Sequence, residues 1–262
     1  MNEMDSLDET LRPLALKISE SGRTVFFTGA GISTESGIPD FRSPGGIWTT
    51  YRPVMFDDFM SSHKARVEYW QQKMAFSELM KDVRPNPAHE AIVRLHVMGL
   101  VEGVVTQNVD GMHQAAGMPE DRVVELHGNG LRVRCMSCRL VSSLQDALDR
   151  IRAGDQAPEC PCGGYLKPDT ISFGQAMPEP EVRKSIELAR ACDCFIVVGS
   201  TLVVQPAASI PLYAREAGAY LSIINLSGTP LDGLADLLVH EKAGTALSML
   251  ADMVAALVPT KR

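Results

Sequence analysis

Residues 29–42, GAGISTESGIPDFR, decide the fold of this chain. They follow the run TVFFT at 24–28, which is short, uninterrupted and rich in β-branched and aromatic side chains, and therefore predicts a buried strand. Gly29 and Gly31 allow the backbone to turn sharply after that strand and to approach a ligand closely. A strand, a glycine turn and a helix in this order form the arrangement that binds the diphosphate of a dinucleotide.

We expect the helix to begin directly after these glycines, with Ser33 or Thr34 as its N-cap. The glycine pattern alone is weak evidence, because the third glycine lies at residue 37, too far along for the usual dinucleotide fingerprint. A tight turn without a ligand is the alternative. The next residues favour a binding site, since the guanidinium of Arg42 can reach a phosphate and the ring of Phe41 can cover a sugar or a planar group.

The 262-residue chain has an ordinary globular composition, with 45% hydrophobic and 22% charged residues. Its net charge of −7 argues against nucleic acid or an anionic membrane as the main partner. No apolar window approaches about 18 residues and the N-terminus MNEMDSLDET is acidic, so we expect no membrane span, no leader sequence and a cytoplasmic location. In that compartment six cysteines indicate metal binding or burial before disulfides.

Strands alternate with helices along much of the chain, which predicts an α/β fold with a doubly wound parallel sheet. The strands that we expect are 24–28, 101–106, 123–126, 194–199 and 220–225. The helices that we expect are 7–21, 55–62, 64–81, 88–98, 142–153, 179–191, 206–217 and 245–257. Right-handed crossovers place the loops that follow the strands at one edge of the sheet, where ligands bind in such folds.

Two inserts interrupt the alternation and define the expected domains. Residues 44–84 contain two helical patches, and residues 131–169 are polar and hold four of the six cysteines. The large nucleotide-binding domain then comprises residues 1–43, 85–130 and 170–262. We expect the aromatic residues of the first insert to form its own core rather than a cofactor site. These aromatic residues are Phe56, Phe59, Tyr69, Trp70 and Phe76.

Two close cysteine pairs lie in the second insert with 21 residues between them, and can supply four thiolates to a tetrahedral zinc ion. The expected ligands are Cys135, Cys138, Cys160 and Cys162. A site with four protein ligands is structural rather than catalytic. The alternative is a set of vacant or oxidised thiols, because the second pair has one intervening residue where zinc ribbons usually have two. Cys192 and Cys194 enter a predicted strand, and we interpret them as buried small hydrophobic residues.

Several motifs in order along the chain resemble those of the sirtuins, the family of NAD-dependent protein lysine deacylases. The motifs are GAGISTESGIPDFRS at 29–43, PNPAH at 85–89, TQNVDGMH at 106–113, ELHG at 125–128, KPDTISFGQAMP at 167–178, GSTLVVQPA at 199–207 and IIN at 223–225. The resemblance covers nearly the whole chain. It implies a Rossmann-type large domain, and a small domain that combines a zinc ribbon with the helical insert.

The resemblance also implies that NAD and an acyl-lysine peptide meet in the cleft between the two domains. It assigns to NAD the residues Gly29, Ala30, Gly31, Ser33, Asp40, Phe41, Arg42, Gln107, Asn108, Val109, Asp110, Gly199, Ser200, Thr201, Asn225, Lys242 and Ala243. Gln107 and Asn108 would act at the nicotinamide ribose, and Val109 and Asp110 would receive the nicotinamide carboxamide. Asn225, at the end of a later strand, would hold the adenosine ribose.

One histidine stands apart from the others by its context. An isolated histidine is usually structural, but His127 follows a predicted strand within ELHG, and the resemblance implies that it is the catalytic general base, with Asn108 also catalytic. The resemblance further implies that a substrate peptide pairs as an added strand with a short segment of the chain. That segment comprises Ile171, Ser172, Phe173 and Gly174.

The implied activity transfers an acyl group from lysine to ADP-ribose and releases nicotinamide, so NAD is consumed and zinc is structural. A protein mono-ADP-ribosyltransferase that uses the same pocket is the alternative, and a non-catalytic NAD-binding module and a dehydrogenase are further candidates. The expected partners are acyl-lysine proteins, with neither nucleic acid nor membrane. The sequence does not determine the oligomeric state and is compatible with a monomer.

The helical insert bears on the acyl chain. Sirtuins that remove succinyl groups carry Tyr-x-x-Arg there, a pair that neutralises the acyl carboxylate. The corresponding stretch YWQQK at 69–73 would place Trp70 and Lys73 at those two positions. We therefore expect neutral acyl chains to be preferred over succinyl.

Overall fold

The large domain is built on a six-stranded sheet in the order β3-β2-β1-β7-β8-β9, and every pair of neighbours is parallel. The computed structural model describes residues 3–41 and 45–258. The strands are β1 (Thr24–Thr28), β2 (Val101–Thr106), β3 (Val123–Glu125), β7 (Cys194–Val198), β8 (Tyr220–Ile224) and β9 (Leu237–Val239). The predicted doubly wound sheet is confirmed, and the short strand β9 was missed.

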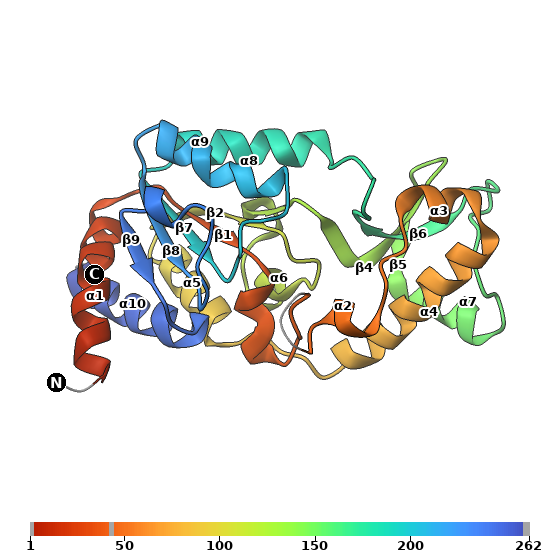
Figure 1. Cartoon of the computed structure of the whole chain (residues 1–262), viewed down its shortest axis with the longest axis horizontal. Helices are drawn as coiled ribbons and strands as arrows, with labels where there is room; N and C mark the ends of the chain where they lie inside the picture. Colours follow the sequence, from red (N-terminus) through yellow and green to blue (C-terminus); the bar gives the residue numbers. More distant parts are fainter. Residues whose placement is uncertain (1–2, 42–44, 259–262) are drawn as a thin grey trace.

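Helices cover both faces of this sheet (Figure 1). On one face lie α1 (Glu3–Glu20), α5 (Pro87–Val97) and α10 (Ala243–Leu257), and on the other lie α8 (Glu179–Ala191) and α9 (Ile210–Glu216). Shorter helical segments are η1 (Ala30–Ser36), α6 (Met112–Ala116), η2 (Glu120–Arg122), η3 (Ala207–Ser209) and η4 (Asp232–Leu234). None of the helices in the described part of the chain combines the length and the apolar character needed to cross a membrane.

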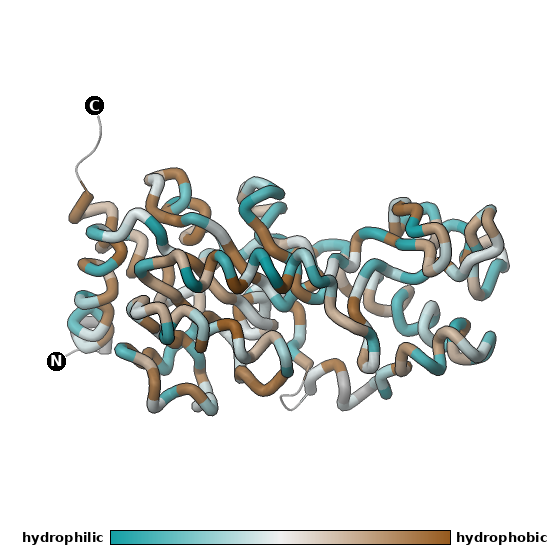
Figure 2. Tube along the Cα trace, turned by 90° about the horizontal axis from the view of Figure 1, so that it is seen from above, coloured by the Kyte–Doolittle hydropathy of each residue, from teal (hydrophilic) through white to brown (hydrophobic). Residues whose placement is uncertain are grey.

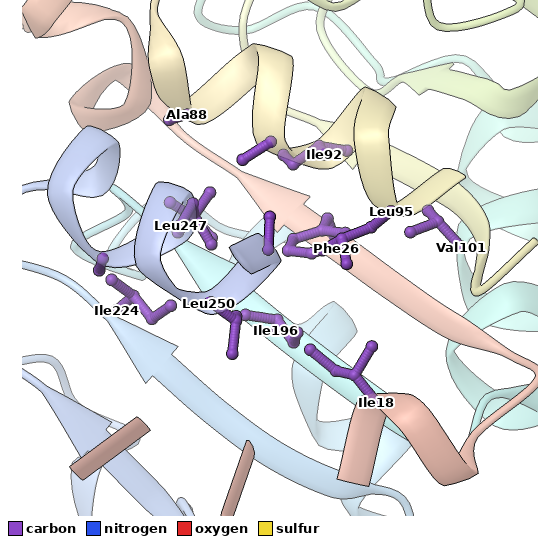
Figure 3. Close-up of a cluster of buried hydrophobic side chains, with 14 of the residues drawn as sticks. Ile18, Phe26, Ala88, Ile92, Leu95, Val101, Ile196, Ile224, Leu247 and Leu250 are labelled. Atoms are coloured by element: carbon purple, nitrogen blue, oxygen red, sulfur yellow. The ribbon is translucent and has the colours of Figure 1, made fainter. Parts of the chain in front are cut away.

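Alternate side chains of β1 enter the two hydrophobic cores. Phe26 belongs to the core under α1, α5 and α10, whereas Val25 and Phe27 belong to the core under α8 and α9. Figure 3 shows Phe26 beside Ile92 of α5 and Leu247 of α10. Because both faces of the strand are buried, it reads in the sequence as a continuous apolar run, as is typical of parallel sheets.

The two inserts together form a second lobe, at the end of the molecule opposite to both termini (Figures 1 and 2). The lobe contains the antiparallel sheet β5-β4-β6 with β4 (Gly128–Cys135), β5 (Val141–Ser143) and β6 (Leu166–Thr170), together with the helices α2 (Ile47–Thr50), α3 (Phe56–Ser61), α4 (His63–Met80) and α7 (Leu144–Arg152). Trp70 of α4 shares a hydrophobic cluster with Val133 of β4 and Leu148 of α7. The residue boundaries assigned to the two domains stay a prediction.

Side-chain caps begin some of the helices but not the segment after β1. Asn86 caps α5, because its side chain accepts from the backbone of Ala88 and His89. The cap expected at Ser33 or Thr34 was wrong. The segment after β1 is a 3-10 helix that begins after Gly29 and has no side-chain cap, and the Ser33 hydroxyl donates to Asp110 instead.

Candidate active site

A cavity of about 1100 Å³ opens where the strands of the large sheet end and the second lobe begins. Most of the residues assigned by resemblance line it, from both domains. These residues are Gly29, Ala30, Gly31, Asp40, Phe41, Gln107, Asn108, Val109, His127, Ile171, Ser172, Phe173, Gly174, Gly199, Ser200, Thr201, Asn225, Lys242 and Ala243. Ser33 and Asp110 lie behind the lining, and Arg42 falls outside the described residues.

The glycine turn packs against the loop that follows β7. The backbone N–H of Gly31 donates to the carbonyl of Gly199 at 2.8 Å, and a Cβ added at Gly31 would lie 2.7 Å from the Cα of Gly199. Glycine is therefore required here because one loop approaches another, which is a firmer reason than the close approach to a ligand that the sequence suggested.

A buried polar group sits under the turn between β2 and α6. The amide nitrogen of Asn108 donates to the carbonyl of Gly29 at 3.1 Å and to the hydroxyl of Ser33 at 3.2 Å. Ser33 in turn donates to a carboxylate oxygen of Asp110 at 2.7 Å, and the other oxygen accepts from the backbone of Met112. Burial raises the pKa of Asp110, while these donors oppose the shift.

His127 faces the cavity from the segment that joins β3 to β4. Its Nδ1 lies 3.0 Å from the carbonyl oxygen of Gln107, so Nδ1 must carry the proton and Nε2 keeps a free lone pair. Burial lowers the pKa of His127, although the Gln107 carbonyl opposes that shift. The backbone carbonyl of His127 accepts from the N–H of Ile171, which ties the histidine to the segment that follows β6. A neutral imidazole oriented in this way can accept a proton.

The opposite end of the cavity is formed by β8 and the N-terminus of α10. The Asn225 side chain donates to the backbone oxygen of Ser227 at 2.7 Å. Glu35 accepts from the backbone N–H of Gly244 at 2.6 Å, so the carboxylate occupies the start of α10, where the helix dipole favours a negative charge. Sequence reasoning did not assign Glu35 or Ser227 to the site, although both follow strands whose ends it had placed at this edge.

Helix α4 forms part of the cavity wall, so the expectation that all aromatic residues of the first insert form a core was wrong in part. Phe59 and Trp70 are core residues as predicted, but Tyr69 and Phe76 line the cavity. Trp70 is 1% exposed and its indole nitrogen donates to the Leu166 carbonyl at 3.2 Å, so it cannot contact an acyl chain in the cavity. The prediction for Trp70 was therefore wrong.

Lys73 does line the cavity, on the same side of α4 as Tyr69, since residues four apart share a helix face. Burial lowers its pKa to about 8, and the nearby charge of Lys167 acts in the same direction. The Tyr69 hydroxyl lies 3.0 Å from the hydroxyl of Thr170, at the end of β6. This wall therefore presents a half-buried ammonium group and a phenol to the cavity.

Four cysteine thiols form a compact cluster in the second lobe. The sulfur atoms of Cys135, Cys138, Cys160 and Cys162 all lie within 4.8 Å of one another. The Cys135–Cys162 and Cys138–Cys160 separations of 3.5 and 3.7 Å are close to the roughly 3.8 Å between thiolates around a tetrahedral zinc. Burial opposes ionisation of Cys135, but backbone N–H donors from Cys138 and Ser137 lower its pKa to about 6.

The cluster therefore fits the structural zinc site that was predicted, including the Cys-x-Cys pair. Cys192 and Cys194 are buried in the large domain, and burial raises the pKa of each thiol to about 12, as befits inert core residues.

The parallel sheet with its cavity at the strand ends, joined to a lobe with a four-thiol cluster, defines a dinucleotide-binding α/β protein with a structural zinc site. A model of the Sir2 family matches residues 29–206. The chain belongs to the Sir2 family, and the resemblance to sirtuins is confirmed.

Relatives and solved structures agree with this assignment. The chain is 48% identical over 231 residues to "NAD-dependent protein deacetylase 1" of Bradyrhizobium diazoefficiens, covering 88% of this chain and 91% of the relative. It is 43% identical to "NAD-dependent protein deacetylase" of Rhodopseudomonas palustris, covering 92% and 96% of the two chains. A structure described as "Sir2-p53 peptide-NAD+" superposes with a TM-score of 0.85 at 33% identity, covering 94% of this chain and 99% of the other.

Proposed function

We propose that this protein is an NAD-dependent protein lysine deacylase that transfers an acyl group from lysine to ADP-ribose, releases nicotinamide and uses His127 as general base. The observation that carries the proposal is the orientation of His127 in the shared cavity. Its Nδ1–H is committed to the Gln107 carbonyl, which leaves Nε2 available to accept a proton from a ribose hydroxyl. NAD is the co-substrate whose cleavage makes the sugar carbon electrophilic.

Other residues of the cavity would contact different parts of NAD. Gln107 and Asn108 would hold the nicotinamide ribose, and this is supported by their position with Val109 in the lining of the cavity. Asp110, with its Ser33 contact, would fix the carboxamide of nicotinamide from behind the lining. The turn that contains Gly31 would hold the diphosphate through backbone N–H groups.

The far end of the cavity suits the adenosine half of NAD. Asn225 lies at the end of β8 with its amide directed at Ser227, and Lys242 and Ala243 begin α10 beside it. Ser200 and Thr201 supply hydroxyl groups midway between the two ends. Phe41 borders the same space and would shield the sugar after nicotinamide leaves.

The peptide would bind at residues 171–174, which follow β6 and line the cavity beside His127. Phe173 is 42% exposed, and its backbone carbonyl accepts from Phe56 N–H, so the segment is anchored to α3 while one side stays open. Pairing along the backbone would read few side chains, so we expect loose sequence preference.

The test is a variant with His127→Ala, incubated with NAD and an acetyl-lysine peptide and followed by mass spectrometry. We expect loss of the acetyl mass with the native enzyme, and a rate about 10²- to 10⁴-fold lower with the variant. His63→Ala is the matched control, because His63 is exposed at the start of α4 and should leave the rate unchanged. Gain of an ADP-ribose mass on the peptide without deacetylation would instead support the mono-ADP-ribosyltransferase alternative.

We also propose that the protein acts in the cytoplasm. The cysteines of the described residues are all free, which suits a reducing compartment. Cell fractionation tests this, and recovery of the protein outside the cytoplasm would contradict it.

A further inference from the structure

Three buried side chains beneath the cavity form a hydrogen-bonded chain that no step of the proposed chemistry uses. They are His113 of α6, Thr28 at the end of β1 and Thr106 at the end of β2, and none is more than 3% exposed. The chain starts behind the sheet edge and ends at the backbone of Asn108, a residue of the cavity wall.

The distances fix how protons are arranged along this chain. The Thr28 hydroxyl lies 2.9 Å from the Thr106 hydroxyl and 2.9 Å from Nε2 of His113. Thr28 donates its single hydroxyl proton to Thr106, so it must accept from a protonated Nε2 of His113. This leaves Nδ1 of His113 as a buried acceptor without a hydrogen-bond partner among the described residues, which is less costly than an unpaired donor.

Thr106 connects this hydrogen-bonded chain to the turn that follows β2 and contains Asn108. Its hydroxyl oxygen accepts from the backbone N–H of Asn108 at 3.0 Å, which closes the turn after β2. The Thr106 hydroxyl oxygen has two lone pairs, and one of them accepts from the Thr28 hydroxyl. The position of Thr28 therefore determines the direction of the other lone pair, which accepts from the Asn108 N–H. The side chain of Asn108 is then free to hold its own two contacts, to Gly29 and Ser33.

His113 is itself held firmly by its surroundings. Its ring packs edge to face against His89, with 5.1 Å between ring centroids. Nδ1 of His89 accepts from the backbone N–H of Asn86, so His89 is oriented by the cap of α5. Burial keeps both rings neutral at physiological pH. A neutral ring of fixed orientation is a reliable donor to Thr28.

We propose that Thr28 and His113 are positioning residues that hold Asn108 in its catalytic orientation through the Thr106 hydroxyl. The proposal rests on the proposed function, since it supposes that Asn108 acts on the nicotinamide ribose. Neither residue touches the cavity. Their effect is therefore on turnover rather than on binding of the peptide.

The test replaces Thr28 with Val, which keeps the shape and removes the hydroxyl, and with Ser, which restores the hydroxyl. We expect kcat for an acetyl-lysine peptide to fall about 10- to 100-fold in Thr28→Val, as for a displaced reacting group, while KM for the peptide changes less than about twofold. Thr28→Ser should recover most of the native kcat. Native kcat in Thr28→Val, or an equal fall in both variants, overturns the proposal.

Thr24→Val is the matched control, because Thr24 lies on the same strand, is fully buried and has a hydroxyl without a hydrogen-bond partner among the described residues. We expect its kcat to equal that of the native enzyme, and a matching fall in this variant would overturn the proposal. Should Thr28→Val fail to fold, His113→Gln and His113→Phe make the same comparison, since only glutamine retains an N–H donor.

A crystal structure of Thr28→Val separates this inference from the proposed function. Displacement of Asn108 from Gly29 and Ser33 supports the positioning role, even if the native enzyme proves inactive on acetyl-lysine. An unmoved Asn108 overturns it. Inactivity of the native enzyme would overturn the proposed function alone.

Discussion

The buried pair His89 and His113 should make the fold sensitive to mild acid. Burial lowers the pKa of His89 from 6.5 to about 4, and burial together with the neighbouring His89 lowers that of His113 from 6.5 to about 3. In the unfolded chain both rings bind a proton below about pH 6.5, whereas in the folded protein they stay neutral until far lower pH. These two histidines therefore leave the free energy of unfolding unchanged above about pH 6.5, their pKa in the unfolded chain, and lower it as the pH falls below that value.

The expected loss can be worked out for a change from pH 7 to pH 5. At pH 5 each ring is nearly fully protonated when unfolded and nearly neutral when folded. Linkage then gives a loss of about 2 kcal/mol in the free energy of unfolding for each ring, and about 4 kcal/mol for both. This is a large share of the roughly 5–15 kcal/mol that stabilises a typical domain.

The assay is urea unfolding at pH 7 and pH 5, for the native protein and for His113→Phe. The phenylalanine variant will be less stable at pH 7, because Thr28 loses a donor, so only the change with pH is compared. We expect the variant to lose about 2 kcal/mol less than the native protein between the two values. His63→Ala is the control and should behave as the native protein does, because its side chain is exposed. Equal pH dependence in His113→Phe and the native protein would refute the reasoning.

Three further predictions concern other parts of the molecule. Cys160→Ser or a chelator should lower the melting temperature and the deacylase rate together, because folding of the lobe is coupled to its metal; an unchanged melting curve would contradict this. Gly128→Ala should cost more than about 2 kcal/mol by denaturant unfolding, since Gly128 has φ +75° and an added Cβ would lie 2.0 Å from the Asp169 carbonyl oxygen; native-like stability would contradict this. Lys73→Met should lower turnover of a succinyl-lysine peptide relative to an acetyl-lysine peptide, because the ammonium lines the cavity; an unchanged ratio would argue against contact.

The central strands of the large domain could be predicted because a strand that is buried on both faces consists of a continuous run of apolar residues. The apolar runs at 24–28 and 194–199 correspond to β1 and β7 almost residue for residue. The three strands of the second lobe were missed for the opposite reason. β4 (Gly128–Cys135) contains two arginines and two glycines, and buried positions do not alternate regularly along it, so its pattern is that of a loop.

The site was predicted to the level of residues where a motif fixed a backbone position, and less well where a side-chain direction mattered. Adjacent helical residues point about 100° apart, so a shift of one position exchanges Tyr69 for Trp70 at the cavity wall. Likewise Ser33 was expected to cap a helix, but its partner Asp110 lies 77 residues away and leaves no local signal. Contacts between distant segments decided both cases.

The interlocked turns at Gly31 and Gly199 have a consequence for anyone who exchanges segments between relatives. The backbone of each turn occupies the space where a side chain at the other glycine would lie. The two turns therefore have to fit each other, although they lie far apart in the sequence. A chimera that imports one turn with a bulkier residue at either position would force its counterpart outward and distort the cavity wall that both turns line. Transplants should therefore carry both segments from the same donor.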